Sequence, residues 1–376
     1  MNIIYVGMDV HKETYTFCAK MAEFGKKTIV LETKQVPASA QEVLKFVKHL
    51  QEKYGEDVKI ECGYEAGCLG YTLYRSLQKW NIDCKILAPT TMLTPQRKRI
   101  KTDSRDASMI ADCLQNGGYG EVYVPTEEDE DVRDYIRMRD DMKEALRRIK
   151  QQISSLCLRQ GWFYFERKWT IKHIEWIRKQ GKRIYDRETM LEYMMVYDYL
   201  TSKVEQLERE IITMAAKERY NEKVKKLTCF LGIRAHTALS LVVEIGDFHR
   251  FSNASAFTSF LGLVPGESSS GEKVTRESLT KAGNKHLRTL LIEGASGICK
   301  GQIGFKGYEL RKRQEGCSPE VIAYADKGNI RMRKKYYRMI HHGKKRNVAV
   351  AAVARELACF VWGMMTEHIL PETAFS

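Results

Sequence analysis

The chain has 376 residues and a mass of 43.5 kDa, enough for two or three domains with real hydrophobic cores. Its 62 Lys and Arg against 48 Asp and Glu give a formal net charge of +14, which favours a polyanionic partner such as nucleic acid. Charge alone does not separate DNA, RNA and an anionic membrane surface. The ten scattered cysteines contain no C-x-x-C pair, so we expect neither a zinc site nor a disulfide framework, and reduced thiols indicate the cytoplasm.

Two stretches bear on membranes and export. The first nine residues carry neither the basic segment nor the cleavage site of a signal peptide. The most apolar stretch, residues 348–365, is interrupted by Arg355 and Glu356, which favours a buried helix over a membrane span. We therefore expect a soluble cytoplasmic protein with no membrane partner.

The N-terminal residues predict an α/β domain that begins with three consecutive strands. Ser39 and Gly55 then bracket an amphipathic helix. Alternation of strand and helix after three strands predicts a mixed sheet with helices on its faces. The expected strands are 3–8, 15–21, 28–36, 58–65 and 84–88, and the later helices are 69–80 and 103–114.

Four acids follow these elements at informative places. Asp9 follows the first strand and Glu65 ends the fourth, so both emerge at one sheet edge if these strands are neighbours. Asp103 and Asp106 share one face of a helix that the basic run 97–101 precedes, although acids are also common there as caps. Clustered carboxylates repel and require a cation, and their oxygens suit Mg²⁺ or Mn²⁺. Two such ions would support phosphoryl transfer.

Residues 126–226 are dense in charge and almost free of proline, with breaks at Gly161 and Gly181. This composition predicts two or three long helices packed as an antiparallel or coiled-coil hairpin, with most charges solvated. Aromatic residues gather between 162 and 176. We interpret them as the core of the hairpin or of a dimer, in preference to a platform on which nucleic-acid bases stack.

The last domain begins at residue 227 and is predicted to be mainly α-helical. A helix ending at Ile245 is followed by a turn at Gly246 and a further helix, and the amides of such a turn often bind phosphate. Residues 327–346 hold nine Lys or Arg and no acid. This is the strongest nucleic-acid footprint in the chain, with a helix that is merely basic on one face as the alternative.

Three serines, Ser268 to Ser270, lie between Gly266 and Gly271, and Lys, Asn, His and Arg follow at 281–288. Glycines permit an unusual backbone, and the cations could hold a phosphate near an exposed hydroxyl. A polar surface turn is the simpler interpretation on local evidence.

Together these blocks resemble the DEDD transposases of insertion sequence family one-ten, which are relatives of the Piv-type DNA invertases. The resemblance covers nearly the whole chain, and the shared order and spacing of its blocks make it specific. The matching blocks are residues 7–12, 64–67 with 70–74, 101–107, 169–176, 244–251, 261–265, the serine stretch, 280–284 and 354–358.

The resemblance implies three domains. Residues 1–125 would form a RuvC-like domain of the ribonuclease H fold, in which Asp9, Glu65, Asp103 and Asp106 hold Mg²⁺ or Mn²⁺. Residues 126–226 would be a helical linker and oligomerisation region. Residues 227–376 would form a transposase domain whose serine attacks DNA and becomes covalently joined to the cut strand. The nucleophile maps to Ser269, with Ser270 as runner-up and Ser268 as a positioning residue.

The resemblance also implies partners. These are donor and target DNA, a structured non-coding (bridge) RNA that pairs with both, and further copies of the chain, as a dimer or tetramer. Different subunits could supply the metal site and the nucleophile. The residues that would bind nucleic acid near the serines are Lys273, Arg276, Lys281, Asn284 and Arg288.

Three other functions stay open at this point. A hydrolytic RuvC-type nuclease would need only the acids and would form no adduct. A sugar-kinase or actin-like ATPase also begins with Gly-x-Asp, but the bulky, charged residues 10–13 disfavour its phosphate loop. A nucleic-acid-binding protein with a decayed site would keep salt-dependent binding after every acid is replaced.

Overall fold

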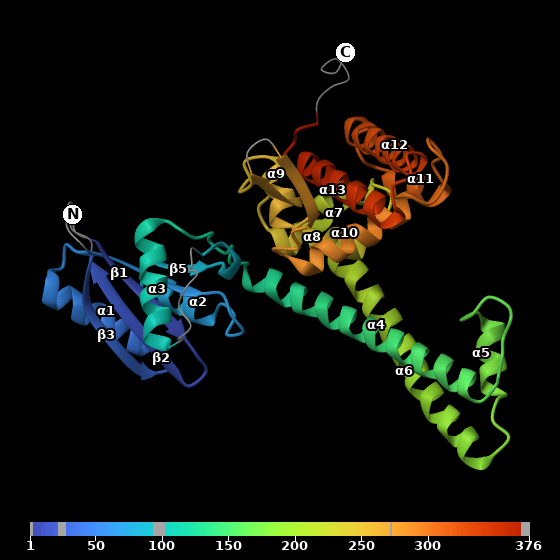
Figure 1. The fold of residues 1–376 in the computed structure, drawn as a ribbon, viewed down its shortest axis with the longest axis horizontal. Helices are drawn as coiled ribbons and strands as arrows, with labels where there is room; N and C mark the ends of the chain where they lie inside the picture. Colours follow the sequence, from blue (N-terminus) through green and yellow to red (C-terminus); the bar gives the residue numbers. More distant parts are fainter. Residues whose placement is uncertain (1–2, 22–27, 93–101, 271–272, 370–376) are drawn as a thin grey trace. The chain divides into compact units, whose positions relative to one another are not determined.

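The computed structural model describes residues 3–21, 28–92, 102–270 and 273–369, with the side chains of 267–277 outside that description. It divides into two compact units, Met1–Val124 and Pro125–Ser376, each of which has its own hydrophobic cores (Figure 1). The predicted basic run 97–101 lies outside the described residues.

The first unit contains a five-stranded sheet in the order β3-β2-β1-β4-β5. β1 pairs with β2 and β2 with β3 in antiparallel fashion, whereas β1 with β4 and β4 with β5 are parallel. The predicted mixed sheet is therefore confirmed. The first strand is longer than predicted and includes Asp9. The strands are β1 Ile3–Val10, β2 Thr14–Met21, β3 Ile29–Pro37, β4 Lys59–Glu65 and β5 Cys84–Leu87.

The helices of this unit follow the predicted punctuation. The Ser39 hydroxyl accepts a hydrogen bond from the Gln41 amide at the start of the first helix, and Gly55 ends it with a φ of 104°. The second helix begins later than predicted, because residues 68–71 form a turn around Gly70, whose φ is 63°. The helices are α1 Ala40–Tyr54, α2 Thr72–Lys79, the 3-10 turn η1 Pro89–Thr91, and α3 Asp103–Asn116.

α3 packs against β1, β2 and β4 at unusually short range. A Cβ placed on Gly7 would lie 2.0 Å from the Ala107 carbonyl oxygen and 2.4 Å from the Ala111 nitrogen. Gly63, which pairs with Gly7 across the parallel strands, would bring a Cβ within 2.9 Å of the Leu114 side chain. Only glycine in β1 lets the helix backbone approach this closely.

The second unit begins with a long antiparallel hairpin of two helices, α4 Glu127–Arg159 and α6 Ile184–Ala215 (Figure 1). The end of α4 packs on the start of α6, through Ile153 and Met194, and the start of α4 packs on the end of α6. The predicted hairpin is confirmed. Near its base the Asp129 carboxylate accepts hydrogen bonds from the Tyr220 hydroxyl at 2.7 Å and from Arg219 at 2.8 Å, which joins α4 to α7 Glu218–Thr228.

The aromatic residues at the far end of the hairpin divide into two groups. Trp162, Trp169 and Trp176 pack against its core, beside α5 Ile171–Arg178, as predicted for a hairpin core. Phe163 and Phe165 are instead 57% and 93% exposed. The prediction of an aromatic core is thus correct for the tryptophans and for Tyr164, whose ring centroid lies 5.2 Å from that of Trp176, and wrong for Phe163 and Phe165.

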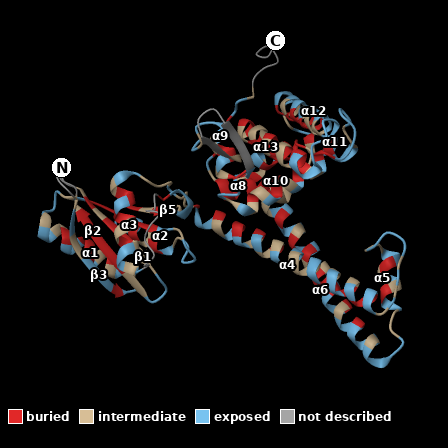
Figure 2. Cartoon of the chain, viewed as in Figure 1, coloured by how far each residue is buried: buried red, intermediate tan, exposed pale blue. Residues whose placement is uncertain are grey.

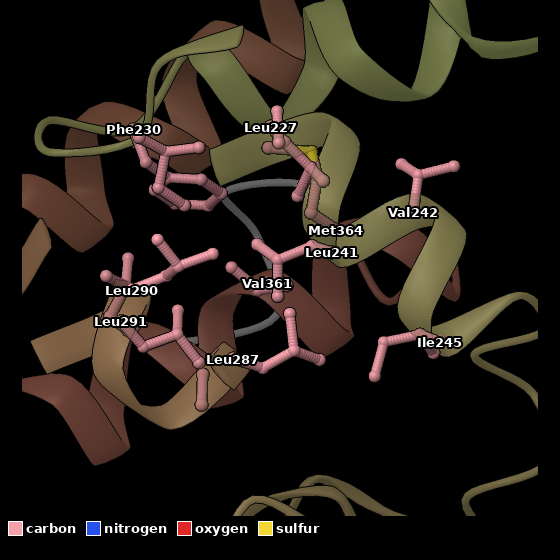
Figure 3. Close-up of a cluster of buried hydrophobic side chains, with 14 of the residues drawn as sticks. Leu227, Phe230, Leu241, Val242, Ile245, Leu287, Leu290, Leu291, Val361 and Met364 are labelled. Carbon is pink, nitrogen blue, oxygen red and sulfur yellow. The ribbon is translucent and has the colours of Figure 1, made fainter. Parts of the chain in front are cut away.

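The rest of the unit is mainly helical, as predicted. Leu227 of α7, Leu241 and Ile245 of α8, Leu287 of α10 and Val361 of α13 converge in one buried core (Figure 3). One strand pair was not predicted: the serine stretch forms the first arm of a β-hairpin, not a loop. The elements are α8 Ala235–Ile245, α9 Ala254–Phe260, β6 Pro265–Ser270, β7 Lys273–Leu279, α10 Lys285–Ile298, α11 Tyr308–Gln314, α12 Pro319–His341 and α13 Arg346–Met365.

α13 is the one helix in the described part of the chain that is long and apolar enough to cross a membrane. Of its most apolar window, 56% is buried inside the protein, and its residues belong to the core of the second unit (Figure 2). The prediction of a buried helix at 348–365 is confirmed.

We predict that Gly7→Ala loosens the contact of α3 with the sheet. The added methyl group overlaps the α3 backbone, so we expect amide hydrogen exchange in β1 and α3 of the full chain to speed up about a hundredfold, which corresponds to about 3 kcal/mol. Gly67→Ala is the matched control, because a Cβ there meets its nearest atom only at 3.9 Å. Unchanged exchange in Gly7→Ala would contradict the short approach.

Candidate active site

The acidic edge of the first unit is built by three elements. β1 and β4 are parallel, and their last paired residues are Met8 and Tyr64, so Asp9 and Glu65 follow side by side at the carboxyl edge of the sheet. Residues two apart in a strand share a face, which puts Asp9 on the same face as Gly7, under α3. Ala107 of α3 lies over Gly7, and Asp103 one turn earlier lies toward Asp9.

The structure brings Asp9 and Asp103 together with a residue that the sequence did not single out, His11. The His11 Nε2 lies 3.2 Å from Asp9 Oδ2 and 4.0 Å from Asp103 Oδ1, and one ligand atom from each of the three lies within 4.8 Å of the others. Asp103 also accepts a hydrogen bond of 3.4 Å from the Gln35 amide. A histidine two residues after Asp9 was visible in the sequence, but its position depends on how the chain turns after β1.

Electrostatics link Asp106 to this group. Burial is the largest cause that raises the pKa of Asp9, the charge of His11 opposes it, and the charges of Asp106 and Asp103 add to it. The net result is an Asp9 pKa above its ordinary value. A carboxylate in this position is therefore stabilised by any positive charge that enters the site.

Asp103 is the first residue of α3, and Asp106 is in its first turn. The residue at the N-cap position of the helix is Thr102, and its side chain makes no capping hydrogen bond. The alternative that Asp103 is itself the helix cap is therefore wrong. Both acids still benefit from the positive end of the helix dipole.

The donor set fits a hard divalent cation. Asp9 and Asp103 supply carboxylate oxygens within a few ångströms of each other, and Mg²⁺ and Mn²⁺ prefer such oxygens. The His11 nitrogen is compatible with Mn²⁺. Glu65 is exposed at the same edge, at the end of β4, and it does not belong to the three-residue group found among the described side chains.

In the second unit, the three serines lie on β6. The register pairs Ser268 with Thr275, Ser269 with Val274 and Ser270 with Lys273. The side chains of these serines, and of the predicted nucleic-acid ligands Lys273 and Arg276, lie outside the described part of the structure.

The base of this serine hairpin is fastened by backbone hydrogen bonds. The Thr280 amide donates to the Val264 carbonyl at 2.9 Å, and the Asn284 amide donates to the Phe260 carbonyl at 3.3 Å. Gly283 has a φ of 93°, and a Cβ there would lie 1.9 Å from the Phe260 oxygen. The chain that leaves β7 is thus held tightly against the end of α9 before α10 begins.

Two of the predicted nucleic-acid ligands have bonds within the protein. The Asn284 side chain caps α10 by accepting from the Leu287 amide, and it donates to Glu244 Oε2 at 3.0 Å. Arg288 donates to the Leu261 carbonyl at 3.0 Å. Lys281 is exposed. The predicted turn at Gly246 is present, but the next helix, α9, begins only at Ala254.

A network of charged side chains joins α4, α8 and α10 beside this base. Asp140 of α4 lies 3.1 Å from His236 and 2.8 Å from His286. His286 also lies 3.4 Å from Glu244, which accepts a hydrogen bond of 2.8 Å from Arg137. We call these residues, Arg137, Asp140, His236, Glu244 and His286, the buried network, in which Arg137 is the exposed member with 53% of its side chain accessible.

Opposite charges set the protonation of the buried network. Burial alone would lower the pKa of His286, but hydrogen bonds to Asp140 and Glu244 outweigh it and raise the pKa to about 9. Burial would raise the pKa of Glu244, but the bond from His286 and the charge of Arg137 bring it to about 2. Hydrogen bonds from His236 and His286 likewise overcome the burial of Asp140 and hold its pKa well below its ordinary value.

The expectation that the hairpin charges are mostly solvated is wrong for the inner face of α4. Arg133 is 6% exposed and donates to the Val243 and Glu244 carbonyls at 2.6 and 3.1 Å, which satisfies the last turn of α8. Arg133, Arg137 and Asp140 are spaced by four and three residues, so they share a helix face. That spacing was the available signal in the sequence, but most of their partners lie more than a hundred residues away.

Comparisons with known proteins agree with this arrangement. Residues 6–162 match the family model of the DEDD transposases of the IS110 type, and residues 224–303 match that of the transposase IS116/IS110/IS902 family. The chain is 31% identical to the transposase for insertion sequence element IS1533 of Leptospira borgpetersenii, over 91% of this chain and 98% of the relative. It is also 31% identical to the y4qE protein of Sinorhizobium fredii, over 96% of this chain and 88% of the relative.

A more distant relative is the transposase for insertion sequence element IS1111A of Coxiella burnetii, with 25% identity over 80% of this chain and 79% of the relative. The two family models match most of the first unit and parts of the second. The chain belongs to the IS110 family of insertion sequence transposases. Membership implies that it recombines DNA, and the DEDD type implies dependence on a divalent metal.

We predict that the buried network makes stability depend on pH above neutrality. The folded pKa of His286, about 9, lies above the ordinary value of about 6.5. Its contribution is therefore complete below pH 6.5 and is lost as the pH rises to 9. We expect the free energy of unfolding to fall by about 2 kcal/mol over this window, measured by urea unfolding followed by helical circular dichroism.

In His286→Gln this dependence should disappear. The matched control is His249→Gln, which removes a histidine whose side chain is 68% exposed and should leave the slope unchanged. An equal slope in wild type and His286→Gln would contradict the ion pairs of His286.

Proposed function

We propose that this transposase cuts and rejoins the DNA of its insertion sequence through a covalent bond between DNA and Ser269, with divalent metal held by Asp9, Glu65, Asp103 and Asp106. The observation that supports the proposal most directly is the approach of Asp9 and Asp103 at one sheet edge. Glu65 lies at the same edge, at the end of β4. Ser270 is the alternative nucleophile, and Ser268 would position the strand.

We propose that the first unit has a RuvC-like ribonuclease H fold. Its three antiparallel strands, followed by two parallel ones, support this assignment, as do the acids at the carboxyl edge. Mg²⁺ or Mn²⁺ bound there would supply positive charge to the scissile phosphate and to the attacking oxygen. Residues 126–226 would be the linker and oligomerisation region, and residues 227–376 the domain that carries the nucleophile.

The covalent step balances as a phosphoryl transfer to serine. The serine hydroxyl loses its proton as its oxygen forms a bond to the scissile phosphorus, and the bond from phosphorus to one deoxyribose oxygen breaks. That oxygen takes up a proton and leaves as a hydroxyl. The phosphodiester energy is kept in the serine–DNA bond, so a second DNA hydroxyl can reverse the step without an external energy source.

The proposed reaction needs residues of both units, contributed by one chain or by two. Because recombination of two DNA duplexes requires several subunits, we propose a homo-oligomer, a dimer or tetramer, that acts on donor and target DNA in the cytoplasm. A structured non-coding RNA of the element would select both DNA sites by base pairing. The net charge of +14 supports nucleic acid as the partner, whether DNA or RNA. Lys273, Arg276, Lys281, Asn284 and Arg288 are proposed to face nucleic acid, although Asn284 and Arg288 would have to keep or exchange their internal bonds.

The first test is a denaturing gel of the protein with element RNA, Mg²⁺ and labelled element-junction DNA. We expect a labelled adduct that resists detergent and disappears with chelator or with Ser269→Ala, because the attacking oxygen is then absent. Ser270→Ala is the matched control and should keep the adduct. Cleavage without adduct, unchanged in Ser269→Ala, would favour the hydrolytic RuvC-type nuclease.

A second prediction concerns the metal. Asp103→Asn should weaken Mn²⁺ binding at least tenfold, because it removes a carboxylate that lies within 4.8 Å of Asp9. Binding is measured by titration calorimetry on the full chain without nucleic acid. Asp57→Asn removes an exposed carboxylate just before β4, at the opposite end of the strand, and should leave the affinity unchanged. Equal affinity in both variants would argue against a metal site at the acidic edge.

A further inference from the structure

One face of α12 is a continuous row of basic side chains. Lys327, Arg331, Lys334, Arg338 and His341 are spaced by four, three, four and three residues, and each is exposed. This spacing keeps all five on one side of a helix. We call them the basic stripe. Over 14 residues at 1.5 Å each, the stripe is about 21 Å long.

The opposite face of α12 is buried, so the stripe has a fixed orientation. Val321, Ala325 and Met332 belong to the core of the second unit, and Gly328 lies against the Phe360 ring of α13. Red and pale blue therefore alternate along α12 in Figure 2. The stripe is held on a helix that cannot turn without breaking this core.

One basic residue of α12, Arg333, is buried, and it holds in place the helix that carries the stripe. Arg333 is 5% exposed and donates to the carbonyls of Ile298 at 3.0 Å, Gln302 at 2.6 Å and Phe305 at 2.9 Å. It fastens α12 to the loop that follows α10. The chain thus uses one buried cation for structure and leaves the others on the outer face.

Acidic residues compensate the stripe only in part. Glu356 of α13 lies 2.5 Å from Arg331 and 2.7 Å from Lys335, so one carboxylate serves two cations. Residues 327–346 contain nine Lys or Arg and no acid. Lys344, Lys345 and Arg346 continue the charge into α13, whose first turn also holds no acid. The excess positive charge at the start of a helix favours an external anion.

We infer that the basic stripe binds the sugar–phosphate backbone of duplex DNA without reading its sequence. The inference rests on the proposed function only for DNA as the partner. Phosphates of one strand follow each other every 3.4 Å along the axis of the duplex, so a stripe of about 21 Å extends over about six base pairs. Its Lys and Arg side chains are cations of the kind that contact phosphate. The Tyr337 hydroxyl beside them is bound to the Gly301 carbonyl at 2.8 Å. Selection of the DNA site therefore comes from elsewhere.

The test is the salt dependence of duplex binding by the full chain. In Lys327→Gln/Lys334→Gln/Arg338→Gln we expect the slope of log affinity against log salt to become shallower by about 2.7, that is about 0.9 for each lost phosphate contact. Affinity should fall at least tenfold, equally for element-junction and scrambled duplexes. Lys172→Gln/Lys182→Gln/Lys223→Gln is the matched control, with the same loss of charge on exposed residues of the hairpin region and α7, and should keep the wild-type slope.

A charge-conserving variant, Lys327→Arg/Lys334→Arg/Arg338→Lys, should also keep the wild-type slope, which separates the effect of charge from an effect on folding. An unchanged slope in the first variant would overturn the inference, and so would a loss confined to folded RNA or to one DNA sequence. Adduct formation at low salt and saturating protein distinguishes this test from that of the serine. Under these conditions the stripe variant should form the adduct. If the wild type showed a normal salt slope but no adduct, the serine mechanism would be contradicted and the inference about the stripe would stand.

Discussion

The backbone of α3 lies directly on the backbone of β1 at Gly7, and the positions of the acids depend on this contact. Asp9 is two residues beyond Gly7 on the same face, while Asp103 is one turn before Ala107. A side chain at Gly7 would lift the helix and move Asp103 away from Asp9. The distance between the two carboxylates thus depends on the lack of a side chain at Gly7. No bond joins the carboxylates directly, and their charges repel.

The second unit solves a different problem, which is how to keep a two-stranded hairpin in place. Such a pair is marginal by itself. Here its base is bonded to the end of α9, and the cap of α10 is bonded to Glu244. Glu244 belongs in turn to the buried network, which reaches α4 through Arg137 and Asp140. The long helical hairpin and the base of the serine hairpin are therefore linked through Glu244, by an ion pair to Arg137 and a hydrogen bond from Asn284.

Much of the first unit was predictable, because β1 is a short apolar run and α1 carries both end signals, Ser39 and Gly55. The serine hairpin was not, since β6 consists of Pro, Gly, Glu and Ser and lacks the alternation of a half-buried strand. Nor was the buried network, because α4 is charged on every side. Only partners distant in sequence, such as Val243 for Arg133, decide which of its charges turn inward.

The backbone between β7 and α10 contains a lysine in the left-handed region, Lys281, with a φ of 54°. A residue with a side chain pays about 1 kcal/mol or more for this conformation, so its neighbours must impose it. The Lys281 amide donates to the Gly262 carbonyl, and hydrogen bonds of Thr280 and Asn284 flank it. Because these bonds make the segment rigid, a displacement of the serine hairpin would also move the first turn of α10.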